Sequence, residues 1–432
     1  MKIGIRKEDR SIWERRSPLT PDDLRELAAA GIPVAAETSD RRIFADAEFR
    51  AAGIAVQPDM ADCDRILGIK EIPPDRFETG KTYLFFAHVV KGQRFNMPML
   101  RAMMDRDVTL FDYERIVDAD GRRLIFFGRH AGLAGMVNTL WALGRRLAAE
   151  GLATPLDRLR QMREYPDLGA AMAAMGELRD RLRREGVPPS IHPLTVGRVG
   201  SGNAGRGAAE ILDAAGAETA GAADLPLPDD APADRIYQVP FRKADWILPR
   251  DPSAAFDAAD YLRRGRTGYR SGFPAFARHL TVLINGMYWD ERYPVLLSAD
   301  DFRALWAGSE PPKLRVVGDI GCDVDGPLAC TVRATDPGNP VYVYDPRTGE
   351  TEDGFAGTGP VVMAVYMLPA EIPRESSIHF SGVLKPFVPA LAAADFSAPL
   401  AEIALPPALR RAMILHRGRL TPDYEYLRKY TG

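Results

Sequence analysis

The sequence predicts an α/β fold with mostly parallel sheets, divided between two domains. Its 432 residues are too many for one compact hydrophobic core. Short apolar strands alternate with helices from the N-terminus onward, and this order is typical of parallel sheets. A glycine-rich turn after residue 199 joins a strand to a helix and indicates a second α/β unit.

The first part of the chain alternates strand and helix. Residues 2–5 form a predicted buried strand. Thr20 is suited to cap a helix and Pro21 to open it, and Gly31 is suited to end it. The alternation continues with strands over 32–36, from Arg65, from Thr82 and over 108–114, and with helices over 45–52 and 96–106.

The second part opens with a long predicted helix of small residues over 131–150, followed by a basic helical segment over 151–190. Apolar runs then predict further strands. After Pro327 the pattern of the sequence changes. The predicted strands cover 194–199, 280–289, 314–320 and 361–368, with an extended segment over 340–344 and helices over 376–395 and 406–416.

The turn Gly200-Ser201-Gly202-Asn203-Ala204-Gly205 follows the pattern G-x-G-x-x-G. In a dinucleotide-binding turn the first glycine permits the tight turn, and the second lets the backbone approach a pyrophosphate. The third lets helix and strand pack closely, and the helix N-terminus faces the phosphate charge. The strand before it and the helix after it therefore predict a bound dinucleotide, with a plain strand–helix turn as the alternative.

Four polar side chains lie at predicted strand ends: Lys70, His88, Lys91 and Glu114. Ligands of open α/β sheets bind beyond the carboxyl ends of strands, so this placement indicates a site. Histidine titrates near neutral pH, and lysine can serve as an acid or base where burial and charge lower its pKa. The alternatives are a solvated lysine and a hydrogen-bonded core histidine.

The composition argues against several classes of protein. A net charge of -3 gives no reason to expect nucleic acid or an anionic membrane as partner. The three cysteines are spread out and suit a reducing compartment, and no set of residues has the spacing of metal ligands. The N-terminus is charged from the start, and no apolar run approaches membrane-spanning length, so we expect a cytoplasmic protein.

Seven motifs together resemble a known family. They are WERRSPLTP at 13–21, GIKEIP at 68–73, FFAHVVK at 85–91, FDYE at 111–114, GRHAG at 128–132, GSGN at 200–203 and LINGMYW at 283–289. With these motifs the chain resembles the lysine–2-oxoglutarate reductase portion of aminoadipic semialdehyde synthase, which is saccharopine dehydrogenase of the L-lysine-forming class. A more distant resemblance links it to alanine dehydrogenase and transhydrogenase.

The resemblance implies two Rossmann-like domains with parallel sheets and a cleft between them. A discontinuous catalytic domain would cover 1–130 and 331–432, and a dinucleotide-binding domain would cover 131–330. The implied reaction condenses the ε-amine of lysine with 2-oxoglutarate and reduces the imine with a nicotinamide hydride to saccharopine. The bifunctional relatives carry a second dehydrogenase domain beyond this point, and we expect that activity to be absent, since the chain stops at Gly432.

The resemblance also implies roles for the strand-end residues. Lys70 and His88 match an acid–base pair, and Arg16 and Lys91 match positions near substrate carboxylates. Glu71 and Glu114 match carboxylates that flank the pair, although a structural salt bridge is an equal alternative for Glu114. The expected cofactor-binding residues are Gly200, Ser201, Gly202, Asn203, Gly205, Asp224, Arg242 and Asp319.

The choice of cofactor depends on two conflicting signals. Asp224 lies about 20 positions after the glycines, where an NAD enzyme places the acid that binds the ribose. Arg206, Arg242 and Lys243 could instead bind a 2′-phosphate. The animal and plant reductases that the chain resembles use NADPH and the fungal enzymes NAD, and the full-length likeness to the former favours NADPH, with NADH as the alternative.

Two other functions compete with this one. A related imine or opine-type reductase, or an alanine dehydrogenase-like enzyme, would act on another amine and keto acid. A non-catalytic nucleotide-sensing scaffold would be expected to lack the acid–base pair, and Lys70 and His88 are both present. The oligomeric state stays open, a homo-oligomer included.

Overall fold

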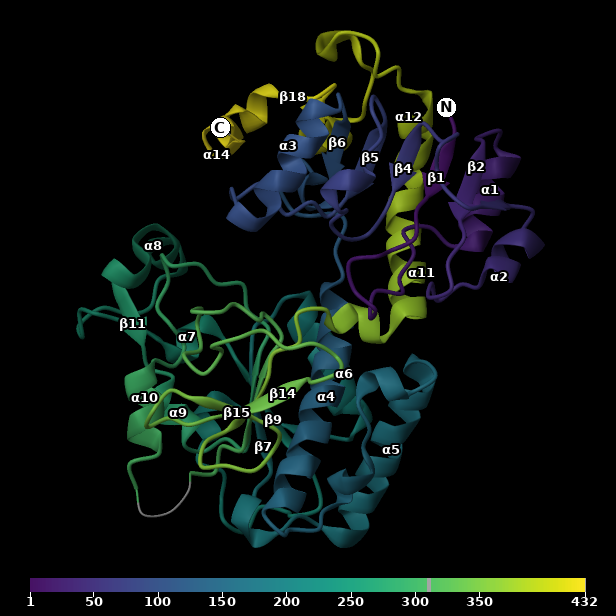
Figure 1. The fold of residues 1–432 in the computed structure, drawn as a ribbon. Helices are drawn as coiled ribbons and strands as arrows, with labels where there is room; N and C mark the ends of the chain where they lie inside the picture. The colour runs from purple at the N-terminus through teal and green to yellow at the C-terminus, as the bar shows by residue number, and fades with distance from the viewer. Residues whose placement is uncertain (309–311, 432) are drawn as a thin grey trace. The chain divides into compact units, whose positions relative to one another are not determined.

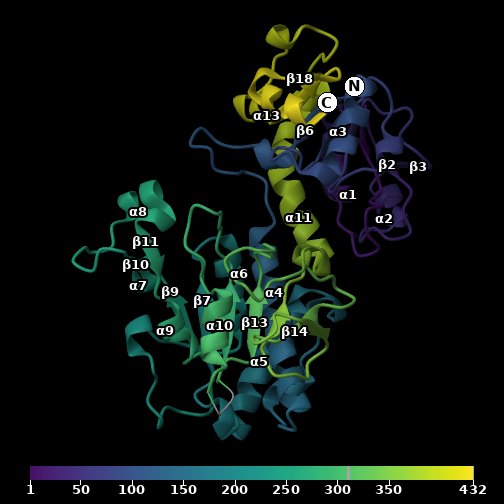
Figure 2. The same ribbon diagram turned by 60° about the vertical axis from the view of Figure 1, so that its left-hand side comes forward.

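The computed structural model describes residues 1–308 and 312–431 and divides into two compact units, each with its own sheet (Figures 1 and 2). Unit 1 consists of Met1–Phe127 and Pro373–Gly432, and unit 2 of Gly128–Ile372. The sequence placed the second boundary at 330/331. Residues 331–372 instead lie in unit 2, because β16 (Val361–Met363) pairs in parallel with β13 (Val316–Asp319) of its sheet.

Unit 1 is built on a sheet of eight described strands, six of them parallel. The carboxyl ends of parallel strands meet at one edge, so the segments after these strands gather there. Across the sheet the order is β18 (Arg419–Leu420), β17 (Met413–His416), β6 (Thr109–Asp112), β5 (Thr82–Phe85), β4 (Arg65–Leu67), β1 (Ile3–Ile5), β2 (Val34–Glu37) and β3 (Ala55–Gln57).

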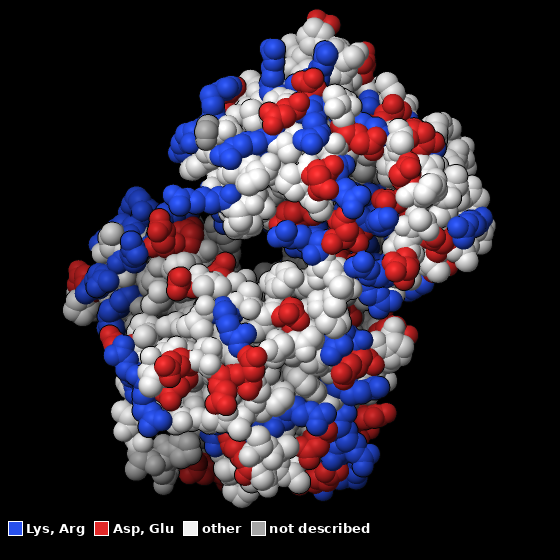
Figure 3. All heavy atoms as spheres, in the orientation of Figure 1, with Lys and Arg blue, Asp and Glu red and all other residues white. Residues whose placement is uncertain are grey.

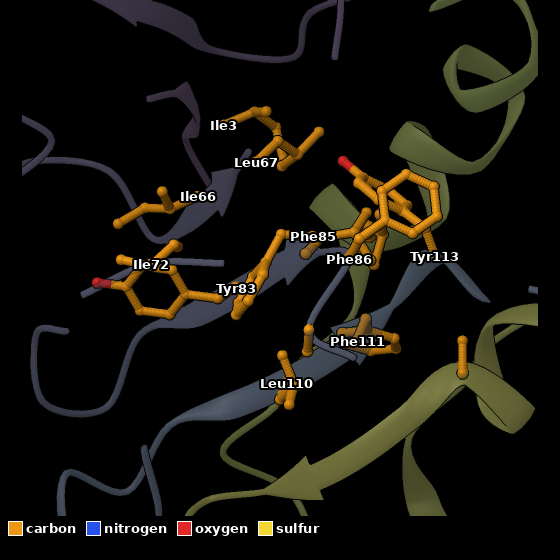
Figure 4. Packing of buried hydrophobic residues seen from close by; sticks show 14 of the residues in the cluster. Ile3, Ile66, Leu67, Ile72, Tyr83, Phe85, Phe86, Leu110, Phe111 and Tyr113 are labelled. Carbon is orange, nitrogen blue, oxygen red and sulfur yellow. The ribbon is translucent and has the colours of Figure 1, made fainter. Parts of the chain in front are cut away.

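The residues expected to cap and open the first helix of unit 1 do so in the structure. Thr20 caps the first helix by accepting the N–H of Asp23, and Pro21 is its first residue. Buried aromatic side chains from β5, β6 and the segments after them form much of the core, as Figure 4 shows for Phe85, Phe111 and their neighbours. The helices are α1 (Pro21–Ala29), α2 (Asp46–Ala51), α3 (Met97–Asp105), α11 (Pro373–Leu384), α12 (Val388–Ala393), α13 (Pro407–Ala412) and α14 (Arg428–Thr431).

The predicted helix over 406–416 is only half right. Helix α13 ends at Ala412, and residues 413–416 form β17, which pairs antiparallel with β6. The run Met413-Ile414-Leu415 is apolar and completely or almost completely buried, so pairing with the sheet overrides the local helical pattern.

Unit 2 carries a second sheet of eight described strands, with the parallel strand β7 near its middle. The sequence did not predict β9, which lies directly beside β7 and displaces the short β8 to the edge. The order is β15 (Thr351–Asp353), β14 (Val341–Tyr344), β16, β13, β12 (Val282–Asn285), β7 (Thr195–Val199), β9 (Tyr237–Phe241) and β8 (Glu218–Thr219).

Helices cover the sheet of unit 2, with α4, α5 and α6 together on one side of it (Figure 1). The predicted helix over 131–150 begins earlier, at Gly128. A small hairpin of β10 (Ile247–Pro249) and β11 (Tyr269–Ser271) lies apart from the main sheet. The helices are α4 (Gly128–Ala149), α5 (Leu168–Glu185), α6 (Asn203–Ala214), α7 (Lys243–Trp246), α8 (Ala258–Arg264), α9 (Pro274–Ala277) and α10 (Ala299–Leu305).

On the face drawn in Figure 3, basic and acidic side chains are interspersed, and neither charge dominates. Among the described helices, none has the length and apolar character needed to cross a membrane.

Candidate active site

Lys70 and His88 follow two neighbouring parallel strands of unit 1. Strands β4 and β5 pair in parallel, and each residue comes three positions after its strand ends. The two segments meet, because His88 Nδ1 lies 2.7 Å from Oε1 of Glu71, the residue after Lys70. The structure therefore brings Lys70, Glu71 and His88 together at the carboxyl edge of the sheet.

The Glu71–His88 pair fixes the histidine ring. Burial would raise the pKa of Glu71, but the hydrogen bond from His88 and the positive charges of His88 and Lys70 lower it to about 2. Glu71 is thus an anion at neutral pH, hydrogen-bonded to the ring of His88. The backbone of His88 is left-handed, with φ 48°, and Asn96 Nδ2 donates to its carbonyl at 3.0 Å. Such strained conformations cluster at functional sites.

Lys70 lies in surroundings that make its ammonium easier to deprotonate. Burial lowers the pKa of Lys70 first, and the guanidinium of Arg16 lowers it further. The carboxylates of Glu71, Glu14 and Glu8 oppose these effects. A lysine with a lowered pKa is suited to exchange protons near neutral pH.

Arg16 is already bound by a carboxylate of the protein itself. Its Nε and one terminal nitrogen bind the two oxygens of Glu14 at 2.7 and 2.5 Å, and both side chains are buried. The guanidinium also stacks over Phe127, 4.2 Å from the ring centroid. The observed contacts of Arg16 therefore act on Lys70 and the local packing, and binding of a substrate carboxylate by Arg16 stays a prediction.

The other two expected residues of unit 1 differ in setting. Lys91 is exposed in the turn after His88. Glu114 forms an ion pair with Arg123 at 2.6 Å, which is the structural alternative considered for it. Both lie in segments that follow β5 and β6, and their contact with a substrate stays a prediction.

Three buried polar residues beside the site were not singled out from the sequence. Glu8 accepts the backbone N–H groups of Ile69 and Lys70. Burial raises the pKa of Asp112 to about 7, and the buried hydroxyl of Tyr113 has no hydrogen-bond partner among the residues that the structure describes. All three follow or end a strand of the parallel sheet, so the strand-end argument used for Lys70 could have found them.

In unit 2 the three motif glycines serve three different purposes. Gly200 has φ 108°, and a Cβ there would lie 2.5 Å from the backbone of Gly286. A Cβ on Gly205 would lie 1.8 Å from the carbonyl oxygen of Gly200. Gly202, which precedes the first residue of α6, Asn203, faces open space instead, with nothing within 4 Å of the Cβ position. Open space at the second glycine fits the close approach of a pyrophosphate.

Close packing of two helices holds this turn. A Cβ on Gly132 of α4 would lie 2.0 Å from the carbonyl oxygen of Ala204, and one on Gly207 would lie 2.1 Å from that of Arg129. Only glycine allows the helices α4 and α6 to approach this closely. The N-terminus of α6 is therefore fixed against α4.

A pocket of about 490 Å³ adjoins the glycine turn. It combines cations with aromatic rings, and of the described residues that line it, none is an aspartate or glutamate. Since β9 lies beside β7, the residues that follow β9, Arg242 and Lys243, reach this pocket. Its lining includes Arg198, Gly200, Ser201, Gly202, Arg242, Lys243, Trp246, Tyr261, Tyr288, Trp289 and Tyr293.

The two acidic residues expected at the cofactor lie in different settings. Asp224 follows the edge strand β8, accepts the N–H of Gly221 at 2.6 Å and does not line the pocket. Asp319 ends β13 and is fully buried, and the protein itself supplies its donors. These donors are Asn285 Nδ2 at 2.8 Å, Thr331 Oγ1 at 2.7 Å and the N–H of Cys322 at 3.2 Å. Cofactor contacts by either residue stay predictions.

Comparison with known proteins shows which known folds this architecture resembles. Residues 4–134 match the family model described as alanine dehydrogenase/PNT, N-terminal domain. The fold of L-alanine dehydrogenase matches over the whole chain with a TM-score of 0.63 at 18% identity. This likeness shows that the chain has the alanine dehydrogenase fold. A transhydrogenase from Sinorhizobium meliloti matches 98% of the chain with a TM-score of 0.52 at 15% identity. The expected fold class, with two Rossmann-like domains of the alanine dehydrogenase type, is confirmed.

Curated relatives confirm the resemblance that the sequence motifs indicate. Alpha-aminoadipic semialdehyde synthase of Arabidopsis thaliana is 35% identical over 98% of the chain, and the rat protein, whose name adds "mitochondrial", is 31% identical over 99%. The chain spans 41% and 47% of these relatives, so less than half of their length. Saccharopine dehydrogenase [NAD(+), L-lysine-forming] of Emericella nidulans is 26% identical, with 89% of the chain matching 90% of that protein.

Proposed function

We propose that this alanine dehydrogenase-like protein is an NAD(P)-dependent oxidoreductase of lysine metabolism that forms saccharopine from L-lysine and 2-oxoglutarate. The observation that carries the proposal is the group formed by Lys70 and the Glu71–His88 pair at the ends of neighbouring parallel strands. Similarity to the synthases and to the fungal saccharopine dehydrogenases supports it. A cytoplasmic location remains a prediction.

The residues of unit 1 suit the condensation step. The amine of lysine must lose a proton as it attacks the ketone of 2-oxoglutarate, and His88, whose ring Glu71 holds through Nδ1, accepts it. The carbinolamine oxygen must gain a proton to leave as water, and the ammonium of Lys70, with its lowered pKa, donates it. A nicotinamide cofactor, when bound, supplies the hydride that reduces the resulting imine.

The residues of unit 2 suit the binding of that cofactor. The open position in front of Gly202 leaves room for a pyrophosphate, and the N-terminus of α6 favours its negative charge. Aromatic side chains such as Trp246 and Tyr261 offer apolar faces to an adenine. Arg242 and Lys243 follow the strand beside β7, and they favour the 2′-phosphate of NADPH over the bare ribose hydroxyl of NADH.

The preference for NADPH can be tested at these cations. Replacing Arg242 and Lys243 together with alanine should raise the KM for NADPH roughly tenfold, the effect of about 1.4 kcal/mol, and leave the KM for NADH nearly unchanged. We expect only a modest rise in this KM, because Arg242 is exposed and also forms an ion pair with Asp245 at 2.9 Å. Arg263→Ala on α8 is the control, since Arg263 does not line the pocket. Equal losses with both cofactors would contradict a role for these two residues in binding the phosphate.

The substrates are tested by following oxidation of NADPH with defined pairs of amine and keto acid. We expect oxidation that requires L-lysine and 2-oxoglutarate together, with saccharopine as the product identified by mass spectrometry. Turnover with pyruvate and ammonia, but not with lysine and 2-oxoglutarate, would favour an alanine dehydrogenase-like role. Turnover with 2-oxoglutarate and a different amine would indicate a related imine or opine-type reductase.

A further inference from the structure

Glu8 forms a buried bridge between two segments of the sheet edge. It follows β1, which pairs in parallel with β4, the strand before Lys70. Its Oε1 accepts the N–H of Ile69 at 2.7 Å, and its Oε2 accepts the N–H of Lys70 at 3.0 Å. One carboxylate thus binds two consecutive peptide groups, and its side chain is only 3% exposed.

The backbone of the Lys70 segment can approach Glu8 because residue 68 is a glycine. A Cβ on Gly68 would lie 3.2 Å from Glu8 Oε1 and 3.1 Å from Cδ of Arg6. These distances are shorter than most contacts made by a Cβ atom, so a larger residue would push the segment away from the carboxylate. The short connection from β4 to Lys70 is therefore shaped around Glu8.

The charge of Glu8 also reaches Lys70. Burial raises the pKa of Glu8 to about 7, against the lowering effects of Arg6 and of the two backbone N–H groups. The titratable groups that face Glu8 include Arg6, whose nitrogen lies 4.0 Å away, Glu14, Arg42 and Tyr113. Those that face Lys70 are Arg16, Glu71, Glu14 and Glu8, and Glu8 favours the protonated form of the lysine.

We infer that Glu8 is a positioning residue for Lys70. Its two hydrogen bonds fix the peptide that carries the lysine. Its negative charge, which is present above a pH of about 7, helps to keep the ammonium protonated on the alkaline side of the profile. Glu8 needs no contact with a substrate for this role. The inference rests on the proposed function, in which Lys70 donates a proton.

Two variants separate the effects of shape and charge. Glu8→Ala removes both acceptors, and we expect kcat/KM to fall about 10²-fold, the scale of a small misplacement of a reacting group. Glu8→Gln keeps the shape and one acceptor oxygen but removes the charge. We expect a smaller fall, together with a shift of the alkaline limb of the kcat profile to lower pH, because Lys70 loses a neighbouring anion.

Glu37→Gln is the matched control. Glu37 also accepts a backbone N–H, that of Lys7 at 2.9 Å, and forms an ion pair with the Lys7 ammonium at 3.2 Å, but it is not among the groups that face Lys70. We expect its pH profile to match the wild type. Thermal unfolding of all three variants shows whether the fold persists. An unmoved profile in Glu8→Gln, or the same shift in Glu37→Gln, would overturn the inference.

A measurement without substrate keeps this test independent of the proposed function. The rate at which an amine-reactive reagent labels Lys70 can be followed against pH by mass spectrometry, and its midpoint reports the pKa of the lysine. We expect the midpoint to fall in Glu8→Gln and to stay in place in Glu37→Gln. If the midpoint falls in Glu8→Gln but the wild type does not form saccharopine, the proposed function fails while the role of Glu8 stands. A midpoint unchanged by Glu8→Gln refutes that role.

Discussion

Lys70→Met and His88→Gln are each expected to lower saccharopine formation by roughly 10²-fold, the usual effect of losing a positioned acid or base. Both variants remove a proton-exchanging group and keep much of its volume. The double variant should lose less than the product of the two effects, because one proton relay is lost only once. Affinity for the cofactor should barely change, since the glycine turn and its pocket lie in unit 2.

The pH profile distinguishes the two residues. The wild type should show a bell-shaped profile of kcat/KM. Activity falls on the acid side where His88 already carries a proton, and on the alkaline side where Lys70 has lost its own. Because burial and Arg16 lower the pKa of Lys70, the alkaline limb should lie below the ordinary pKa range of lysine. His88→Gln should lose the acid limb and Lys70→Met the alkaline limb.

Matched controls come from the same unit. Lys385→Met removes a lysine that is paired with Asp23 and Glu26, and His416→Gln removes a histidine that contacts the carbonyl oxygen of Phe396. Both should leave kcat/KM within a few-fold of the wild type. If Lys70→Met and His88→Gln keep full activity and both limbs of the profile, the assignment fails, and Glu114 is the next residue to test.

Gly202→Ala is expected to weaken binding of NADPH by at least tenfold, about 1.4 kcal/mol, while the fold stays intact. A methyl group at this position meets nothing within 4 Å in the protein, but it would occupy the space that a pyrophosphate needs. Titration of the intrinsic tryptophan fluorescence with NADPH measures the affinity, and thermal unfolding without cofactor measures the stability.

Gly205→Ala gives the contrasting result. Its methyl group would lie 1.8 Å from the carbonyl oxygen of Gly200, which is backbone and cannot swing aside. We expect a loss of about 1–3 kcal/mol in the free energy of unfolding, as for other forced overpacking. If Gly202→Ala binds NADPH like the wild type, the nucleotide does not bind at this turn. If it unfolds like Gly205→Ala, the open position in front of Gly202 is not real.

The parts of the site that follow local rules could be predicted from the sequence. An apolar run comes before Lys70, before His88 and before the glycine turn, and each run ends at a polar residue or a glycine. The position of such a short strand is determined by the local sequence pattern, so it can be predicted. The two strands before Lys70 and His88 are neighbours in the sheet, as expected. Pairing between distant strands then decided where their side chains meet.

The parts that depend on strand order could not be predicted. Nothing in the local pattern of Tyr237–Phe241 shows that this strand displaces β8 from the side of β7. Asp224 was therefore expected at the cofactor, where the fold instead places Arg242 and Lys243 in the pocket. The donors around Asp319 come from two other segments, and the peptides bound by Glu8 lie some sixty residues away. Such pairings carry no periodic signal along the chain.

The division of unit 1 between the two ends of the chain has a consequence for how the protein is made. Unit 2 is one continuous stretch and can fold while synthesis proceeds, whereas unit 1 has to wait for its last strands. Until β17 emerges from the ribosome, β6 remains an open edge of the sheet, and Arg65 lacks the carbonyl groups of Leu391 and Ala394 that it binds. The edge strand β6, next to the strands that precede Lys70 and His88, is thus synthesised early and paired on both sides only near the end of synthesis.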